Sequence, residues 1–231
     1  MISNDIANNL HAIQERVEAA ARKSGRNPDD IKLVAVSKTK PPELVRQAID
    51  AGAAILGENY IQEAREKIEL LGREVAWHFI GHLQSNKAKY AAGLFDLIHS
   101  VDSFRLAEAL SKAAAKQNKT QAILIQVNTS GETTKSGAAA AETRALINEI
   151  APLPHIAIKG LMTMPPWSDD PEDARPYFIQ LRTLRDELTG TVPETVSLTE
   201  LSMGMSTDFE VAIEEGATLV RVGTSIFGAR K

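Results

Sequence analysis

The chain has 231 residues, of which 43% are hydrophobic, and its 26 basic and 30 acidic residues leave a net charge of −4. This length allows one large α/β domain or two small ones, and the acidic balance argues against a general nucleic-acid or anionic-lipid surface. With no cysteine, the sequence excludes disulfides, thiolate metal sites and a cysteine nucleophile. No apolar run approaches the roughly 20 residues of a membrane span, so we expect a cytoplasmic protein that binds neither membranes nor nucleic acid.

The N-terminal segment predicts an amphipathic helix. Ile2, Ile6, Leu10, Ile13 and Val17 recur every three or four residues and therefore form one apolar stripe. The segment lacks the charged start, apolar core and cleavage site of a signal peptide. We expect the stripe to pack on the body of the protein or on a neighbouring subunit.

Strand-like and helix-like segments alternate along the rest of the chain. The expected strands cover residues 33–37, 53–58, 75–81, 94–101, 122–128, 156–164, 196–204 and 218–223. Helical patterns begin near residue 42 and cover residues 59–72, 82–93, 102–117, 139–151, 175–188 and 206–217. The alanines at 138–141 are expected to begin one of these helices.

This alternation predicts a parallel α/β fold, because each helix returns the chain to the start of another parallel strand. About eight strand–helix units in this length indicate a TIM (β/α)8 barrel preceded by an extra N-terminal helix. An open doubly wound sheet is the competing architecture. The sequence shows no linker, so residues 1–231 are expected to form a single domain.

Polar residues follow most of the expected strands. In a closed barrel the reactive groups lie at the carboxyl ends of the strands, where the βα loops meet. Those positions hold Lys38, Glu58, Asn59, His82, Asn128, Thr163, Ser202 and Gly223. The sequence therefore places its candidate site at one rim of the barrel.

Lys38 ends the first expected strand, in "LVAVSKTKPP". A lysine at a strand end is commonly solvated or paired with a carboxylate. It can also capture a carbonyl group as a Schiff base, which requires a neutral, desolvated amine that neighbouring cations favour. Position alone leaves both interpretations open.

The C-terminal segment "MGMSTDFEVAIEEGATLVRVGTSIFG" suggests a phosphate site. Ser206 is expected to be the N-cap of a helix, and Gly223 and Thr224 follow the last strand, so backbone N–H groups and hydroxyls come together. Barrels frequently bind phosphate after strands seven and eight. The glycines could merely form turns, but with Lys38 the set indicates either a Schiff-base aldolase or a pyridoxal phosphate site.

An ordered set of motifs resembles one known family across almost the whole chain. These motifs are "AVSKTKP", "LGENYIQEA", "WHFIGHLQSNK", "NTSGETTKSG", "GLMTM" and "LSMGMSTDFEVAIEEGATLVRVGTSIFG". They are similar to the pyridoxal phosphate homeostasis proteins, also called the YggS or PROSC family. The resemblance implies a barrel similar to the N-terminal domain of alanine racemase, with pyridoxal 5′-phosphate held as an internal aldimine.

The resemblance also assigns roles to individual residues. It implies that Lys38 is the attachment point, that Asn59 lies beside the cofactor ring and that Arg221 faces the pyridine nitrogen. The residues implied to hold the phosphate are Ser206, Gly223 and Thr224. Three further cofactor contacts are carried over from the motifs: His82, Ser202 and Met205.

Arg221 bears on whether the protein is an enzyme. A carboxylate would keep the pyridine nitrogen protonated and make the ring a strong electron acceptor, whereas a permanently charged guanidinium discourages that protonation. Alanine racemase pairs its lysine with a tyrosine from a separate C-terminal domain, and we expect no such domain after Lys231. Tyr90 and Tyr177 are expected to be packing residues, and Tyr60 at most approaches the mouth.

The resemblance therefore implies a monomeric, non-enzymatic handler of pyridoxal phosphate that acts in vitamin B6 homeostasis, with apo forms of pyridoxal-phosphate enzymes as possible partners. Two alternatives remain open. The protein could be a low-activity amino-acid racemase, or an aldolase that uses Lys38 on a sugar phosphate without a cofactor.

Three other groups of residues have simpler explanations. His78 and His82 are four apart but follow a strand pattern, so we expect no metal site. Asp208 and Glu210 lie in the first turn of an expected helix, where the helix dipole favours negative charge. The "KSG" segment at 135–137 is expected to be a solvated loop rather than an anion contact.

Overall fold

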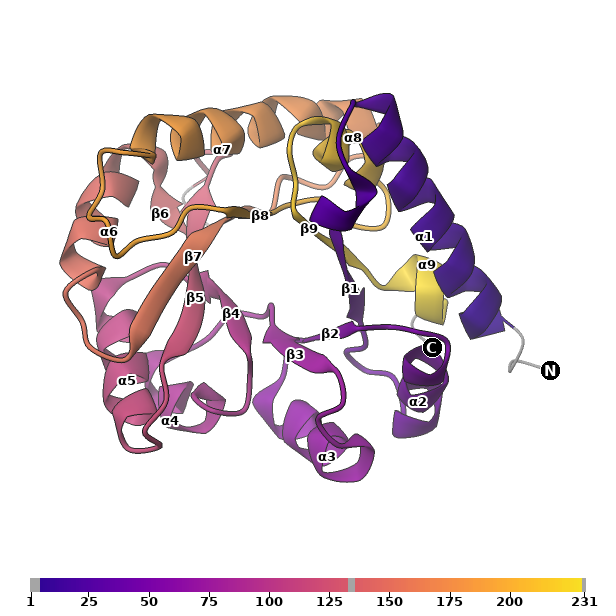
Figure 1. The fold of residues 1–231 in the computed structure, drawn as a ribbon, viewed down its shortest axis with the longest axis horizontal. Helices are drawn as coiled ribbons and strands as arrows, with labels where there is room; N and C mark the ends of the chain where they lie inside the picture. The colour runs from indigo at the N-terminus through magenta and orange to yellow at the C-terminus, as the bar shows by residue number, and fades with distance from the viewer. Residues whose placement is uncertain (1–4, 133–135, 230–231) are drawn as a thin grey trace.

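The computed structural model describes residues 5–132 and 136–229, and their parallel strands close into a barrel (Figure 1). The strand order is β4-β3-β2-β1-β9-β8-β7-β5, and β4 also pairs with β5, which closes the ring. The barrel strands are β1 (Lys32–Val36), β2 (Ile55–Glu58), β3 (Ala76–Phe79), β4 (Leu97–Val101), β5 (Gln121–Asn128), β7 (Ile156–Met162), β8 (Glu200–Ser202) and β9 (Leu219–Val222). The predicted TIM barrel is confirmed, and the open doubly wound sheet is wrong.

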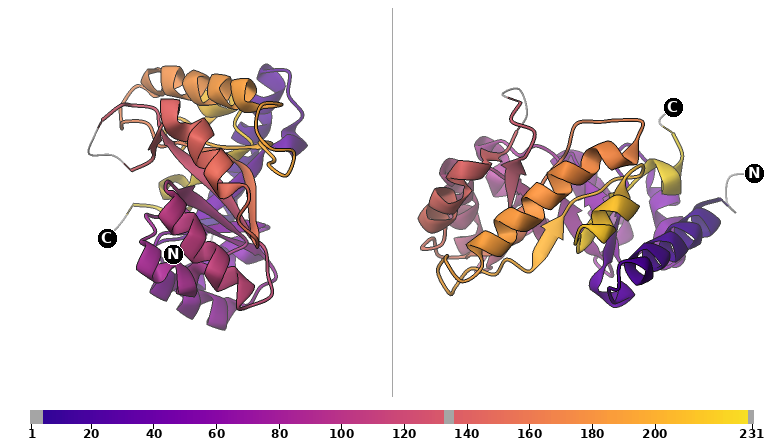
Figure 2. Two further views of the ribbon diagram at one scale, coloured as in Figure 1. Left: turned by 90° about the vertical axis from the view of Figure 1, so that its left-hand side faces the viewer. Right: turned by 90° about the horizontal axis from the view of Figure 1, so that it is seen from above.

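The helices lie outside the ring of strands (Figures 1 and 2). The α-helices are α1 (Asp5–Lys23), α2 (Pro42–Asp50), α3 (Ile61–Leu71), α4 (Ala88–Ala91), α5 (Phe104–Ala115), α6 (Thr143–Ile150), α7 (Arg175–Leu188), α8 (Phe209–Glu214) and α9 (Thr224–Phe227). Short 3-10 helices are η1 (Pro28–Asp30), η2 (Ser85–Lys87), η3 (Ala140–Glu142) and η4 (Pro171–Ala174). Within the described ranges, no helix combines the length and the apolar character needed to cross a membrane.

Two expected helices differ from the structure. Ala138 and Ala139 do not begin a helix but form the short strand β6, which pairs with the end of β5. A Cβ on Gly137 would lie 2.7 Å from the backbone nitrogen of Asn128, so the chain runs directly against β5 just before these alanines. The helix expected at 82–93 is reduced to η2 and the single turn of α4: Leu83 is buried, and Gln84 directly after it has an extended backbone and precedes η2.

Two separate apolar clusters result from the alternation of side chains along each strand. One lies between the strands and the surrounding helices. The other fills the interior of the barrel and consists of Val34, Leu97, Leu124, Met162 and Leu219. Residues two positions further along these strands point to the same interior face, nearer the carboxyl ends.

The apolar stripe of α1 packs on the barrel's own exterior. Ile6, Leu10, Ile13 and Val17 are all buried, and Ile2 lies outside the described residues. Helix α1 lies beside α8 and α9 (Figure 1). The prediction that this helix packs on the body of the protein is confirmed for the described part of the stripe.

Candidate functional site

Lys38 lies at the carboxyl end of β1, at the mouth of the barrel. The Ser37 N–H donates to the carbonyl oxygen of Gly57 over 3.0 Å, so the β1–β2 pairing continues to the residue before the lysine. Val34 belongs to the interior cluster, the alternation along the strand assigns Val36 to the same face, and Lys38 lies two residues beyond the end of the strand. Lys38 is half-buried in this position.

Arg221, on β9, is buried inside the barrel with 3% of its surface exposed. Its Nη1 donates to Ser202 Oγ over 2.5 Å, and its Nη2 donates to the carbonyl oxygen of Thr163 over 3.0 Å. Burial lowers the pKa of Arg221 to about 10, while Asp208 acts in the opposite direction. The guanidinium therefore remains charged at neutral pH, and both of these acceptors are neutral.

A chain of hydrogen bonds continues from Ser202 across the barrel interior. Because Arg221 can only donate, Ser202 Oγ accepts from it and donates its own hydrogen to His99 Nδ1, 2.8 Å away. The Nε2–H of His99 then donates to His78 Nδ1 over 3.0 Å. Burial lowers the pKa of His78 to about 4 and that of His99 well below its usual value, so both rings are neutral.

Ser206 and Gly223 meet at the neighbouring strand end. The Gly223 N–H donates to Ser206 Oγ over 3.2 Å. A Cβ on Gly223 would lie 3.3 Å from both the Cβ and the carbonyl oxygen of Val36, so the glycine lets β9 approach β1 closely. Thr224 follows immediately as an exposed residue at the start of α9. These three predicted phosphate ligands therefore lie together beside the strand that leads to Lys38.

The expected N-cap at Ser206 is wrong, because helix α8 begins three residues later with Asp208 as its N-cap. The Met205 N–H donates to Asp208 Oδ1 over 2.5 Å, which closes a turn before the helix. Burial raises the pKa of Asp208, and hydrogen bonding acts to lower it. The turn leaves Ser206 directed toward Gly223 and leaves Met205 half-buried.

Asn59 follows β2 and is half-buried at the mouth. Its Oδ1 is buried and has no hydrogen-bond partner among the described residues. A Cβ on Gly81 would lie 2.5 Å from the carbonyl oxygen of Asn59, so glycine is required where the loop after β3 crosses this position. The side chain of Asn59 thus offers an unsatisfied polar atom at the mouth.

His82 lies in the loop after β3 and is exposed, whereas His78 is buried inside the barrel. The two rings therefore occupy different environments, as expected for a strand. His82 Nδ1 is 3.5 Å from Ser136 Oγ, which is at the limit of a hydrogen bond. Lys135, from the "KSG" segment, lies outside the described residues.

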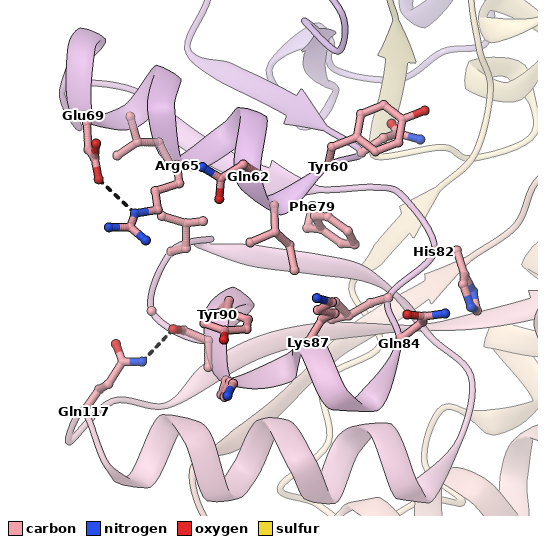
Figure 3. A pocket seen from close by; sticks show the side chains of 18 residues that line it. Tyr60, Gln62, Arg65, Glu69, Phe79, His82, Gln84, Lys87, Tyr90 and Gln117 are labelled. Carbon is pink, nitrogen blue, oxygen red and sulfur yellow. Dashed lines mark hydrogen bonds and ion pairs between the residues drawn. The ribbon is translucent and has the colours of Figure 1, made fainter.

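Beside the mouth, a cavity of about 1040 Å³ lies between α3 and the short η2–α4 segment (Figure 3). Gln62 and Arg65 lie on one side of this cavity, and Gln84 and Lys87 lie on the other. It shares Asn59 and His82 with the rim of the mouth.

The tyrosine predictions are borne out only in part. Tyr90, expected to be a packing residue, lines this cavity and leaves 50% of its surface exposed. The short α4 leaves this part of the outer layer open. Tyr60 is 57% exposed at the start of α3, and Tyr177 is half-buried on α7.

Asp208 and Glu210 do not form a carboxylate pair. Glu210 accepts a bidentate pair of hydrogen bonds from Arg16 of α1, at 2.9 and 2.8 Å, whereas Asp208 accepts from the turn before α8. Both carboxylates thus have structural partners.

Comparisons with known proteins agree with the fold. The family model described as alanine racemase, N-terminal domain, matches residues 8–231. Solved alanine racemases are similar in fold alone: the enzyme from Corynebacterium glutamicum is 19% identical with a TM-score of 0.70, covering 96% of this chain and 62% of that one. The shared architecture is the barrel.

Other relatives are much more similar in sequence and in length. Pyridoxal phosphate homeostasis proteins from Aquifex aeolicus and Escherichia coli are 48% and 42% identical, covering 96% and 98% of this chain and 97% of each relative. The structure of PipY from Synechococcus elongatus with PLP bound is 39% identical, with a TM-score of 0.81 over 92% of this chain and 100% of that one. This chain therefore belongs to the alanine racemase N-terminal domain family and, within it, to the pyridoxal phosphate homeostasis proteins.

Proposed function

We propose that this protein binds pyridoxal 5′-phosphate covalently through Lys38 and acts in vitamin B6 homeostasis without sustained catalytic turnover. Relatives that are 48% and 42% identical carry the name of that function, and PipY was solved with PLP bound. The observation in this chain that carries the proposal is the arrangement of the mouth. Lys38 follows the carboxyl end of β1, and Gly223, which donates to Ser206, follows the carboxyl end of the neighbouring strand β9.

The residues at the mouth would fit the cofactor's phosphate, its pyridine nitrogen and, through Lys38, its aldehyde. The hydroxyls of Ser206 and Thr224 and the backbone at Gly223 would hold the phosphate, in the type of backbone–hydroxyl cradle that anions favour. The charged guanidinium of Arg221, supported by Ser202, would donate to the pyridine nitrogen.

Three further residues would border the ring. Asn59 has an unsatisfied buried oxygen at the mouth and would lie beside the ring. Met205 and His82 would complete its surroundings, at the turn before α8 and in the loop after β3 respectively.

Lys38 would supply the covalent bond. Its amine nitrogen would hold the cofactor at the aldehyde carbon through a C=N bond, with loss of one water molecule. When bound, the cofactor supplies a ring that can accept electrons from a substrate carbon.

The environment of Arg221 favours binding over turnover. Its pKa of about 10 keeps the group charged at neutral pH, and a guanidinium has no acceptor for a proton. A ring nitrogen held against this group would accept a hydrogen bond and stay unprotonated, so the ring would accept electrons poorly. The arrangement supports a carrier more than an enzyme.

The competing functions are a low-activity amino-acid racemase and a cofactor-free aldolase. Cα proton exchange measured by NMR in deuterated water, on several amino acids, separates the first from the carrier. We expect no sustained exchange that depends on Lys38, and such exchange would establish an enzyme.

The biological setting completes the proposal. We propose that residues 1–231 act as one pyridoxal-phosphate-binding domain, as a cytoplasmic monomer that supplies cofactor to apo enzymes.

The direct test of binding is an absorbance titration of the purified protein with pyridoxal phosphate. We expect a visible band that forms in the wild type and is absent in Lys38→Ala. The control variant Lys112→Ala removes an exposed lysine of α5 and should behave as the wild type. A protein that stays colourless at saturating cofactor would contradict the proposal and favour the aldolase.

A further inference from the structure

A buried ionic cluster lies between α3 and the barrel, directly behind the mouth. Lys67 of α3 is only 2% exposed. Its Nζ donates to the carbonyl oxygen of Ser37 over 2.6 Å, to Glu58 Oε1 over 2.7 Å and to Glu63 Oε1 over 2.6 Å. Ser37 Oγ also donates to Glu58 Oε1 over 2.6 Å. All three hydrogens of the ammonium group are therefore used.

Packing alone does not explain this lysine. Lys67 lies on the same face of α3 as the buried residues Ala64, Ile68 and Leu71, where an apolar side chain would suffice. Replacing a buried ion pair with well-packed apolar residues is often neutral or stabilising. The cluster also carries a cost, because burial raises the pKa of Glu58 despite the opposing effect of Lys67, and Glu58 Oε2 is buried without a hydrogen-bond partner among the residues that the structure describes.

The residue after Lys38 has a strained backbone that the same cluster holds. Thr39 has φ of 62°, in the left-handed region, which is unfavourable for an L-residue with a branched Cβ. Its N–H donates to Glu63 Oε1 over 2.6 Å, the same oxygen that accepts from Lys67. This hydrogen bond fixes the turn in its strained conformation.

We infer that Lys67, together with Glu58 and Glu63, is a positioning residue that sets the direction of the Lys38 side chain. Lys38 stands between two backbone groups that the cluster holds, the Ser37 carbonyl and the Thr39 N–H. The inference rests on the proposed function of Lys38 and deepens it.

The cluster reaches a second predicted cofactor contact. Glu58 directly precedes Asn59, so one buried ammonium group ties the two strand ends together. Loss of this ammonium group would release the strained turn. A change of about 1.4 kcal/mol in the free energy of holding the turn corresponds to a roughly tenfold change in cofactor affinity.

Glu63 allows a test with little risk to folding, because its side chain is 25% exposed. Glu63→Ala removes the acceptor for the Thr39 N–H, whereas Glu63→Gln keeps a carbonyl oxygen there. In absorbance titrations with pyridoxal phosphate, we expect Glu63→Ala to weaken binding roughly tenfold and Glu63→Gln to stay within about threefold of the wild type. Amide hydrogen exchange at Thr39 should accelerate in Glu63→Ala alone, measured without cofactor.

Lys67→Met tests the centre of the cluster, and Lys112→Met is its matched control. Lys112 makes a 2.6 Å ion pair with Glu108, but its side chain is 67% exposed. We expect Lys67→Met to weaken binding at least roughly tenfold and Lys112→Met to bind as the wild type.

Adding Thr39→Gly distinguishes positioning from a general loss of packing. Glycine adopts the left-handed conformation without the Cβ penalty, so Lys67→Met/Thr39→Gly should recover most of the lost affinity. Poor docking of α3 would not be corrected by a change at Thr39.

The outcomes separate this inference from the proposed function. If the wild type forms no covalent adduct at Lys38, the proposed function fails. If the wild type forms it, unchanged affinity in both Glu63→Ala and Lys67→Met overturns the positioning role. The positioning role is also overturned if Lys67→Met weakens cofactor binding and the added Thr39→Gly does not restore it.

Discussion

The hydroxyl of Ser202 joins a charged side chain to a neutral one inside the barrel. It accepts from Arg221 and donates to His99, which in turn donates to His78. This order fixes both imidazoles in the Nε2–H form, because the only group that must donate is the guanidinium. The direction of each hydrogen bond in this chain from Arg221 to His78 thus follows from a single arginine.

Ser202→Ala should therefore be costly despite its small change in size. The substitution leaves an N–H of Arg221 and the Nδ1 of His99 without their partner at a site with 0% exposure. We expect a loss of about 1–3 kcal/mol in the free energy of unfolding, measured by urea denaturation. Ser103→Ala is the control, since Ser103 makes no capping bond at α5, and an equal effect in both variants would contradict this account of Ser202.

The sequence identified strand-end residues well and helix-side residues poorly. Ser202 was expected at the rim because parallel strands bring their carboxyl ends together, whereas Arg221, which donates to it, was expected only from the family resemblance. His99 was missed, although it lies two residues after the interior residue Leu97. Lys67 was also missed. It interrupts the apolar face of α3, but a lysine on such a face becomes informative only when the structure shows which carboxylates it contacts.

At the scale of elements, helix boundaries were predictable where local signals agreed with packing. Helix α7 begins and ends at the predicted residues 175 and 188. The alanines at 138–141 have high helix propensity, yet tertiary contact with β5 draws the first two into β6. Helix α4 is a single turn because the chain before it buries Leu83. Local propensity could not reveal either long-range contact.

Helix α1 contributes to stability as part of the barrel's outer layer. Leu10 is 0% exposed on its apolar stripe, so Leu10→Ala should lower the free energy of unfolding by about 2–5 kcal/mol. The matched control is Leu70→Ala, at a leucine of α3 that is 69% exposed, where we expect a change within about 0.5 kcal/mol. Urea denaturation measures both, and similar losses would show that α1 does not cover a core.

For the whole molecule, the barrel interior is divided into an apolar layer and a polar layer. The apolar layer contains Val34 and Leu219, and the polar layer contains His78, His99 and Arg221. The polar layer is thus formed by side chains of the barrel strands, whose carboxyl ends form the mouth. The two neutral histidines make the stability of the fold depend on pH.

His78 has a pKa of about 4 in the folded protein against an ordinary value of 6.5. Below pH 6.5 the unfolded chain binds the proton and the folded chain does not, so stability is lost as pH falls toward 4. This loss is of the order of 3 kcal/mol for His78. The raised pKa values of Glu58 and Asp208 act in the opposite direction.

The contribution of His78 is therefore measured best by comparing variants. Gln can accept from His99 without titrating, so the free energy of unfolding of His78→Gln should depend less steeply on pH between 6.5 and 4. Urea denaturation at stepped pH gives the slopes, with His11→Gln, at an exposed histidine of α1, as the control. Parallel profiles for His78→Gln and the wild type would contradict a buried neutral imidazole.

The most direct test of the account maps the covalent bond itself. The protein is incubated with pyridoxal phosphate, reduced with borohydride, digested and analysed by peptide mass spectrometry, with Lys38→Ala treated in parallel. We predict one reduced cofactor adduct, on the peptide that contains Lys38, and no stoichiometric adduct in the variant. An adduct on another lysine, or none in the wild type at saturating cofactor, would contradict the central claim that Lys38 holds the cofactor.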